Sequence, residues 1–138
     1  MAVKYTKVGP GTLTVGELGS EVDFSCQVTQ CVLSAEKDQE DNLNALCGDV
    51  IPGDITYNWQ LSGELVQDLS EDGVNKFTFE NAGEQFPFVF EPNSLTGPTL
   101  SGTLILDPLD IGGAANTKAT AEFEFSVVGK PVWTDNGI

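Results

Sequence analysis

The densest group of potential metal ligands in the sequence is the acidic segment from Asp38 to Asn42, which reads Asp-Gln-Glu-Asp-Asn. Carboxylate and amide oxygens are the ligands that Ca²⁺ takes in proteins. A calcium-binding EF-hand loop also needs a glycine at its sixth position and a glutamate at its twelfth. Counting from Asp38, these positions hold Leu43 and Asp49. The segment therefore does not predict a metal site, and we expect a solvated or partner-facing loop.

Paired carboxylates and cysteines are the other groups with potential chemistry. Glu122 and Glu124 lie on one face of a predicted strand, and a carboxylate pair can catalyse glycoside hydrolysis. Because the chain has 21 acidic residues, such pairs arise by chance, and this one indicates a solvated face. Cys26, Cys31 and Cys47 are an odd number and lack the C-x-x-C spacing of zinc sites, so we expect free thiols.

The composition excludes several classes of function. The 138 residues include 21 acidic residues, six lysines, no arginine and no histidine, for a formal net charge of −15. Without histidine, the Ser-His-Asp and Cys-His nucleophile systems are excluded. DNA-binding proteins gain affinity from lysine and arginine, and anionic membranes attract basic clusters, so binding to either is not expected. We expect no enzyme activity, no cofactor and no membrane partner.

The length and the N-terminus predict one domain made in the cytoplasm. A chain of 138 residues has the size of a single domain, so we assign residues 1–138 to one unit. The start of the chain lacks the apolar run of about 7 to 15 residues that a signal peptide shows. No stretch approaches the roughly 20 apolar residues of a membrane-spanning helix. We therefore expect synthesis and retention in a cytoplasm.

Apolar residues recur at every second position over most of the chain, which predicts β-strands with one buried face. The alternating runs cover residues 13–15, 22–33, 55–65, 86–90, 99–107 and 119–127, and Gly129-Lys130-Pro131 is expected to end the last strand. Strands joined mostly by short turns predict an all-β fold, a β-sandwich or barrel-like domain. The aromatic residues in phase with the buried faces are expected to form the core: Phe24, Tyr57, Trp59, Phe77, Phe86, Phe88, Phe90, Phe123 and Phe125.

One short α-helix and one long loop interrupt the strands. Ser70 offers an N-cap with acids in the following turn, and apolar residues at helical spacing lead to a stop at Gly83, so a flanking helix is expected there. The segment 34–54 after the second strand is charged and has too few apolar residues for its own core. A loop of this length is explained if it packs on another subunit. The residues expected at that contact are Glu36, Asp38, Glu40, Asp41, Leu43 and Leu46.

Several motifs follow one another in a distinctive order along residues 55–131. The first three are Tyr57-x-Trp59-x-Leu61-x-Gly63, Asp72-Gly73-Val74-Asn75-Lys76-Phe77 and Phe86-Pro87-Phe88-Val89-Phe90-Glu91-Pro92-Asn93. The next three are Gly97-Pro98-Thr99-Leu100-Ser101-Gly102, Pro108-Leu109-Asp110-Ile111-Gly112-Gly113 and Phe123-x-Phe125-x-Val127-Val128-Gly129-Lys130-Pro131. In this order they resemble the major tail protein, or tail-tube protein, of bacteriophages with long non-contractile tails. The first 54 residues match that family mainly in general plan.

The resemblance implies six copies to a ring, and rings stacked into a tube through which DNA passes without specific binding. It implies that the loop 34–54, an N-terminal arm 1–10 and a C-terminal tail 132–138 reach between rings, with Trp133 as the anchor of the tail. The partners would be other copies of the chain and the tape-measure, tail-terminator and distal tail proteins. The location would be the virion tail, assembled in the host cytoplasm. An acidic wall suits a DNA conduit independently, because it repels phosphate.

Three other functions remain as alternatives. A capsid decoration protein is also acidic and rich in β-structure, but it stays soluble alone and binds a preformed shell. An immunoglobulin-like adhesion or carbohydrate-binding module would need a secretion route and exposed aromatic rings, and the sequence indicates neither. A glycosidase with a carboxylate pair would lose its activity when a single glutamate or aspartate is replaced.

Overall fold

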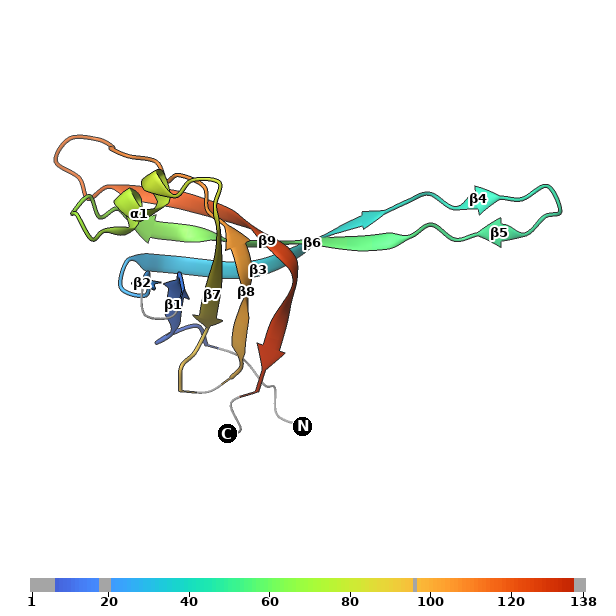
Figure 1. Ribbon diagram of the computed structural model, residues 1–138, viewed down its shortest axis with the longest axis horizontal. Helices are drawn as coiled ribbons and strands as arrows, with labels where there is room; N and C mark the ends of the chain where they lie inside the picture. Colours follow the sequence, from blue (N-terminus) through green and yellow to red (C-terminus); the bar gives the residue numbers. More distant parts are fainter. Residues whose placement is uncertain (1–6, 18–20, 96, 136–138) are drawn as a thin grey trace.

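The computed structural model describes residues 7–17, 21–95 and 97–135, and within them the chain is mainly antiparallel β-structure with one short helix (Figure 1). This architecture confirms the predicted all-β class. The strands are β1 (Thr12–Val15), β2 (Val22–Asp23), β3 (Val28–Gln39), β4 (Leu43–Asn44), β5 (Val50–Ile51), β6 (Ile55–Val66), β7 (Gln85–Glu91), β8 (Thr99–Ile105) and β9 (Thr120–Thr134). The helix is α1 (Val74–Glu80).

Seven of these strands form one antiparallel sheet in the order β2-β1-β7-β8-β9-β6-β3, and β4 pairs with β5 separately. The sheet bends at β9, whose first half pairs with β6 and whose second half turns to run along β8 (Figure 1). The partners of Thr103 and Ser101 in β9 are Val128 and Val132, so extra residues form a bulge between them. The prediction that β9 ends at Gly129 to Pro131 is therefore wrong, because a bulge takes Pro131 out of the ladder and lets the strand continue.

The core lies inside the bent sheet and is closed at one end by α1. Phe24, Phe88, Phe90, Phe123 and Phe125 are buried, together with Leu13, Val15, Leu61, Leu65, Val74, Leu104, Leu106, Leu109, Ala121 and Val127. The remaining rings at its edge, Trp59, Phe77 and Phe86, are partly buried and pack against it. The ring of Phe77 on α1 lies 6.4 Å from that of Phe24 and 5.3 Å from that of Phe86, which joins the helix to the turn after β2 and to β7.

Tyr57 is a correction to the predicted core. Its side chain is 57% exposed, although it lies on the same face of β6 as the fully buried Leu61. The pairing of β6 with β9 ends at Trp59, so within the described residues no third strand lies beside Tyr57. Alternation identified the correct face of the strand, but the layer that buries this face does not extend to Tyr57.

Two local predictions are also wrong. The expected strand 22–33 breaks after Asp23, because the carbonyl of Phe24 accepts the N–H groups of Gln27 and Val28 in a turn, both at 3.0 Å. Ser70 does not cap the helix: α1 begins at Val74 with Gly73 as its N-cap residue and no side-chain cap bond. The Ser70 hydroxyl instead donates to Asp68 Oδ1 at 2.7 Å, a local bond that competes with capping.

The expected loop 34–54 is largely paired β-structure. β3 continues to Gln39, which faces Ile55 at the start of β6, and Leu43 faces Ile51 further out. Between these pairs the Glu40 N–H donates to the Asp54 carbonyl at 2.9 Å. We call residues 34–58 the hairpin extension and residues 43–51 the hairpin tip. The extension projects from the sheet along the longest axis of the molecule (Figure 1).

Candidate interaction surfaces

The hairpin extension is a two-stranded ribbon with two chemically different faces. Side chains of residues that face each other in an antiparallel pair lie on the same side. Tyr57 pairs with Lys37 and Ile55 pairs with Gln39, on the side that continues from the core pair Leu33 and Leu61. The opposite side carries the pairs Glu36 with Asn58 and Asp38 with Thr56. One face is therefore partly apolar and the other is acidic and polar.

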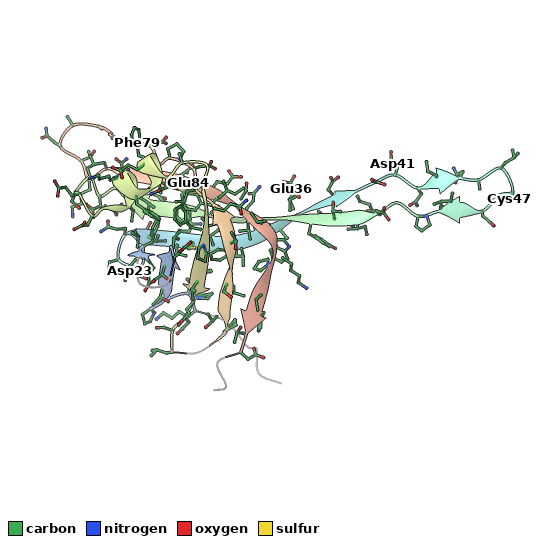
Figure 2. The ribbon with its side chains drawn as sticks, in the orientation of Figure 1. Asp23, Glu36, Asp41, Cys47, Phe79 and Glu84 are labelled. Atoms are coloured by element: carbon green, nitrogen blue, oxygen red, sulfur yellow. The ribbon has the colours of Figure 1, made fainter. Side chains whose placement is uncertain are left out.

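The hairpin tip exposes several apolar side chains. Leu43, Val50 and Ile51 are each more than half exposed, and Leu46 is fully exposed. The turn is shaped by Gly48, whose φ of +97° favours glycine, and Cys47 lies beside it at the far end (Figure 2). An isolated two-stranded hairpin is at best marginally stable in water. The tip thus combines apolar exposure with little support from its own chain, as expected of a surface that a partner covers.

All six residues predicted for the inter-subunit contact lie on the hairpin extension. Glu36, Asp38, Glu40 and Asp41 are exposed along its length, and Leu43 and Leu46 are exposed on the tip. Figure 2 shows Glu36 and Asp41 at two positions along the ribbon. Ile55 and Tyr57 also belong to this surface, which the sequence did not predict because their alternation has the same form as that of a core strand.

The outer face of strands β3, β6 and β9 is acidic. Glu122 of β9 lies directly opposite Glu64 of β6, and Glu124 lies opposite Ser62. With Asp110 from the connection before β9, these carboxylates line an open hollow of about 480 Å³. Two like charges placed directly opposite each other destabilise a sheet. At the positions where β6 pairs with β3 and β9, none of the outward side chains is a lysine, so the charge is uncompensated there.

The end of the molecule that carries α1 has an apolar surface of its own. Leu69, Phe79 and Ile111 are 63%, 65% and 57% exposed, and with Asn75 and Lys76 they line a hollow of about 220 Å³. We call this the helix-end hollow. Phe79 lies at the opposite end of the long axis from Cys47 (Figure 2).

Two side-chain amides hold the segments around the helix-end hollow together. Asn75, which is 2% exposed, accepts the Asp68 N–H at 2.9 Å and donates from Nδ2 to the Asp110 carbonyl at 3.1 Å. Gln67 accepts the Gly112 N–H and donates from Nε2 to the Gly112 carbonyl, both at 2.9 Å. These bonds fix the segment before α1 against the connection that carries Ile111. Neither amide was predictable from the sequence, because a single polar residue of this kind produces no periodic pattern.

The predicted anchor Trp133 lies in β9 opposite Leu100 and is 65% exposed. Its indole Nε1 donates to Asp135 Oδ1 at 2.8 Å, so within the described residues it lies at the surface and not in a pocket of its own chain. Residues 136–138 of the tail and 1–6 of the arm lie outside the described residues. The described part of the arm lies against the β7–β8 connection, where the Gly9 N–H donates to the Pro92 carbonyl at 2.7 Å.

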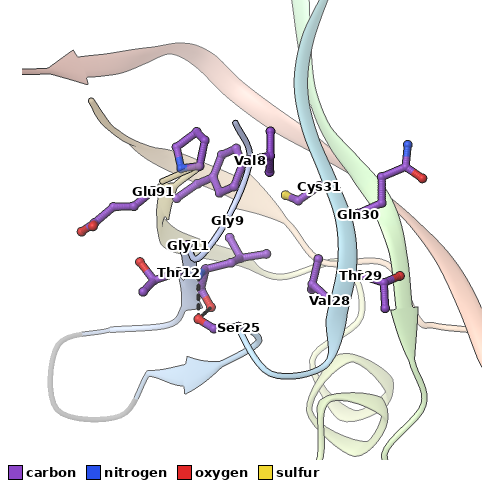
Figure 3. A pocket seen from close by; sticks show the side chains of 13 residues that line it. Val8, Gly9, Gly11, Thr12, Ser25, Val28, Thr29, Gln30, Cys31 and Glu91 are labelled. Atoms are coloured by element: carbon purple, nitrogen blue, oxygen red, sulfur yellow. Dashed lines mark hydrogen bonds between the residues drawn. The ribbon is translucent and has the colours of Figure 1, made fainter. Parts of the chain in front are cut away.

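A small hollow of about 150 Å³ lies between the arm with β1 and the edge strand β3, and the Cys31 thiol points into it (Figure 3). Burial raises the pKa of Cys31 to about 12. The three cysteines are free, and Cys26 and Cys47 are exposed. Cys31 is thus protonated at neutral pH and behaves as a small apolar side chain.

Among the described residues, no group of three His, Cys, Asp or Glu side chains is placed to hold a metal ion. Across the same residues, no helix has the length and apolar character needed to cross a membrane.

No known family model and no curated protein matches the chain in sequence. Solved structures do share its fold. A chain in the virion of a native gene transfer agent particle matches with a TM-score of 0.58 at 18% identity, over 88% of this chain and 95% of that chain. A chain in the tail of an empty gene transfer agent particle, determined with C6 symmetry, matches with a TM-score of 0.58 at 18% identity, over 89% of this chain and 94% of that chain. The shared fold therefore extends over nearly the whole of each chain.

Proposed function

We propose that this protein is the subunit of a phage-type tail tube, in which six copies form a ring and the rings stack around a channel for DNA. The observation that carries the proposal is the hairpin extension, a ribbon that exposes Tyr57, Ile55 and the apolar tip without a covering layer of its own chain. The shared fold with a chain of a C6-symmetric tail supports the same assembly. In this proposal the extension packs on neighbouring subunits.

The acidic outer face of β3, β6 and β9 suits the wall of the channel. Glu64, Glu122 and Glu124 stand on adjacent strands, with no lysine at the outward positions where β6 pairs with β3 and β9, and Glu64 directly opposes Glu122. Such a wall repels DNA phosphates, so a moving duplex meets no deep binding minimum. The cost of placing like charges opposite each other is thereby explained by the function of the surface.

The remaining parts of the chain have roles that follow from the same assembly. The exposed indole of Trp133 suits contact of the tail 132–138 with a neighbouring ring, and residues 7–10 of the arm 1–10 lie beside the β7–β8 connection at the same end of the sheet. The partners are other copies of this chain and the tape-measure, tail-terminator and distal tail proteins. The role is structural and non-catalytic, in a virion tail assembled in the host cytoplasm.

A shortened hairpin tests the proposal. Lys37 and Tyr57 face each other, so residues 38–56 can be replaced by Asn-Gly, a pair that favours a two-residue hairpin turn. The variant should remain a folded monomer, because the removed segment adds nothing to the buried core. It should form no tubes by negative-stain electron microscopy under conditions in which the full chain does. Tubes of normal diameter from the shortened chain would contradict the proposal.

The channel wall is tested separately by charge reversal. Replacing Glu122 and Glu124 by lysine should leave tube formation intact but lower DNA delivery by particles that contain the variant. Replacing Glu84 and Asp107, which are exposed elsewhere, makes the same change in charge and should have no such effect. If full-length chains never form tubes but bind empty capsids, the function is that of a decoration protein.

A further inference from the structure

We propose that the helix-end hollow is a docking site for a basic, amphipathic segment of a different protein. The segment places one large apolar side chain between Leu69, Phe79 and Ile111, and its lysines or arginines against the carboxylates around them. The inference does not depend on the tube function, because the hollow lies at the other end of the molecule from the hairpin tip (Figure 1).

The walls of the hollow are apolar side chains that water reaches in the single chain. Leu69, Phe79 and Ile111 are each more than half exposed, and they come from the segment before α1, from α1 and from the connection before β9. The hollow measures about 220 Å³, and a cavity of roughly 150 Å³ already holds benzene, so a leucine or phenylalanine side chain fits. Covering the walls removes apolar surface from water, which favours binding.

The charge around the hollow selects a basic partner. Segments 67–80 and 107–118, which carry the walls, contain two lysines, Lys76 and Lys118, and six acidic residues. The acidic residues are Asp68, Glu71, Asp72, Glu80, Asp107 and Asp110, and all of them except Asp68 are exposed. Lys76, which lines the hollow, lies 3.8 Å from Glu80 and so already has an anionic neighbour. These segments therefore attract a surface rich in lysine or arginine and repel an acidic one.

Segments of a second copy of this chain suit the hollow poorly. The hairpin tip belongs to segment 34–54, which has six acidic residues and one lysine and is therefore repelled. The N-terminal arm has Lys4 and Lys7, but the Lys7 carbonyl accepts Asn93 Nδ2 at 3.2 Å and the Gly9 N–H donates to the Pro92 carbonyl at 2.7 Å. The described part of the arm is thus bound to its own sheet. The other four lysines stand singly in the sequence, too few to offset the excess of acidic residues.

The hollow is already shaped in the single chain. The buried amide of Asn75 accepts the Asp68 N–H at 2.9 Å and donates to the Asp110 carbonyl at 3.1 Å. Asp68 and Asp110 are the neighbours of Leu69 and Ile111 in sequence, so these two walls are held together before a partner arrives. A preformed receiving surface avoids the entropy cost of ordering it on binding.

A synthetic peptide tests the site on the full-length chain. In this peptide, leucines at positions i, i+3, i+4 and i+7 form one face of a helix and lysines fill the other positions, whereas a control peptide has serine in place of every leucine. Fluorescence anisotropy measures the binding of each labelled peptide at concentrations at which light scattering shows a monomeric protein. The leucine peptide should bind about tenfold more tightly, because only its side chains fill the hollow. Amide chemical shifts of the ¹⁵N-labelled chain should change most in segments 67–80 and 107–112.

Matched variants of the chain locate the bound peptide. Leu69→Ser and Ile111→Ser should each weaken binding of the leucine peptide about tenfold, because each removes an apolar wall. Val132→Ser removes a side chain that is 57% exposed like Ile111 but lies outside the hollow, and it should leave the affinity unchanged.

The contribution of charge is tested with neutral replacements. Glu71→Gln combined with Asp72→Asn should weaken binding of the leucine peptide and reduce its dependence on salt, because these acids lie in segment 67–80. Asp38→Asn combined with Glu40→Gln removes the same two charges from the hairpin extension and should leave the affinity unchanged.

Two results would overturn the docking proposal. Equal affinities in Leu69→Ser, Ile111→Ser and Val132→Ser would show that the peptide is held by net charge alone. The arm of another copy would be the occupant if the full chain associates without peptide, and if both Ile111→Ser and the pair Lys4→Glu with Lys7→Glu abolish that association. Electron microscopy of tubes decides the proposed function separately, so the two proposals can fail independently.

Discussion

The two ends of the molecule both expose apolar side chains, but they hold them in different ways. At the hairpin extension, Tyr57 and Ile55 stand on a two-stranded ribbon beyond the last β9 partner. At the helix end, Leu69 and Ile111 stand on segments that the buried Asn75 ties together. The hairpin surface is exposed because β9 does not pair with β6 beyond Trp59. The helix-end surface is exposed on segments that the Asn75 hydrogen bonds hold in place. The chain therefore exposes apolar side chains on a projecting ribbon at one end and on a rigid, preformed surface at the other.

The exposure of the hairpin extension can be tested with two residues of the same strand, β6. Leu61 and Tyr57 lie on the same face of β6, the first fully buried and the second 57% exposed. Leu61→Ala should lower the free energy of unfolding of the monomer by about 2 to 5 kcal/mol, because it leaves a cavity in the core. Tyr57→Ala should lower it by about 1 kcal/mol or less, because no layer of its own chain packs on it. Urea denaturation measures both values.

Tube formation should distinguish the two variants in a different way from monomer stability. Tyr57→Ala is expected to weaken tube formation while its monomer remains stable, as seen by light scattering at equal protein concentration. A large loss of monomer stability in Tyr57→Ala would show that the extension folds back on its own sheet, and the contrast between the two ends would fail.

The sequence predicted the strands well wherever a strand has one wet and one buried face. The alternation of Phe123 and Phe125 with Glu122 and Glu124 identified both sides of β9 correctly. The same alternation placed Tyr57 in the core, because the period of a strand reveals which face is apolar and not whether a second layer covers it. This limit also explains why the sequence predicts a loop at segment 34–54: the strands there are exposed to solvent on both faces, so their apolar residues do not alternate.

The candidate surfaces were predictable only in part. The charge of the segment after Ser34 predicted an exposed element outside the core, since so polar a stretch cannot form one, and its contact with a partner stays a prediction. The helix-end hollow was not predictable, because Leu69, Phe79 and Ile111 come from three separate elements that only the fold brings together. The bulge around Gly129 was not predicted for a related reason: glycine and proline mark either the end of a strand or a bulge, and only the pairing with β8 shows that β9 continues.

The helix end is tested by comparing its two amides. Asn75→Ala should lower the free energy of unfolding by about 2 kcal/mol, because it removes a buried side chain and leaves the Asp68 N–H and the Asp110 carbonyl without their partner at a partly buried position. Gln67→Ala removes three hydrogen bonds, but water reaches these groups, so a loss of about 1 kcal/mol or less is expected. Thermal and urea denaturation provide the values. A greater loss of stability in Gln67→Ala than in Asn75→Ala would mean that the number of hydrogen bonds matters more than their burial at this end of the molecule.

The smallest expected effect concerns the turn that precedes α1. The Ser70 hydroxyl and then the Ser70 N–H donate to Asp68 Oδ1, and these bonds lower the pKa of Asp68 below its ordinary value. A lowered carboxyl pKa stabilises the fold above the pKa of the unfolded chain, and this contribution is lost as the pH falls through the pKa of the folded state. Ser70→Ala should therefore raise the pKa of Asp68 and slightly destabilise the protein near neutral pH.

The difference in stability between Ser70→Ala and the wild type should shrink in acid, once Asp68 is protonated in both proteins. Carboxyl NMR titration follows the pKa of Asp68, and urea denaturation at neutral and acidic pH follows the stability. Thr117→Ala, which removes an exposed hydroxyl that donates to the Ala114 carbonyl instead of to a carboxylate, is the matched control and should show no such pH dependence. An unchanged pKa of Asp68 in Ser70→Ala would show that the Ser70 N–H alone stabilises this turn. The Ser70 hydroxyl would then contribute nothing to the structure before α1.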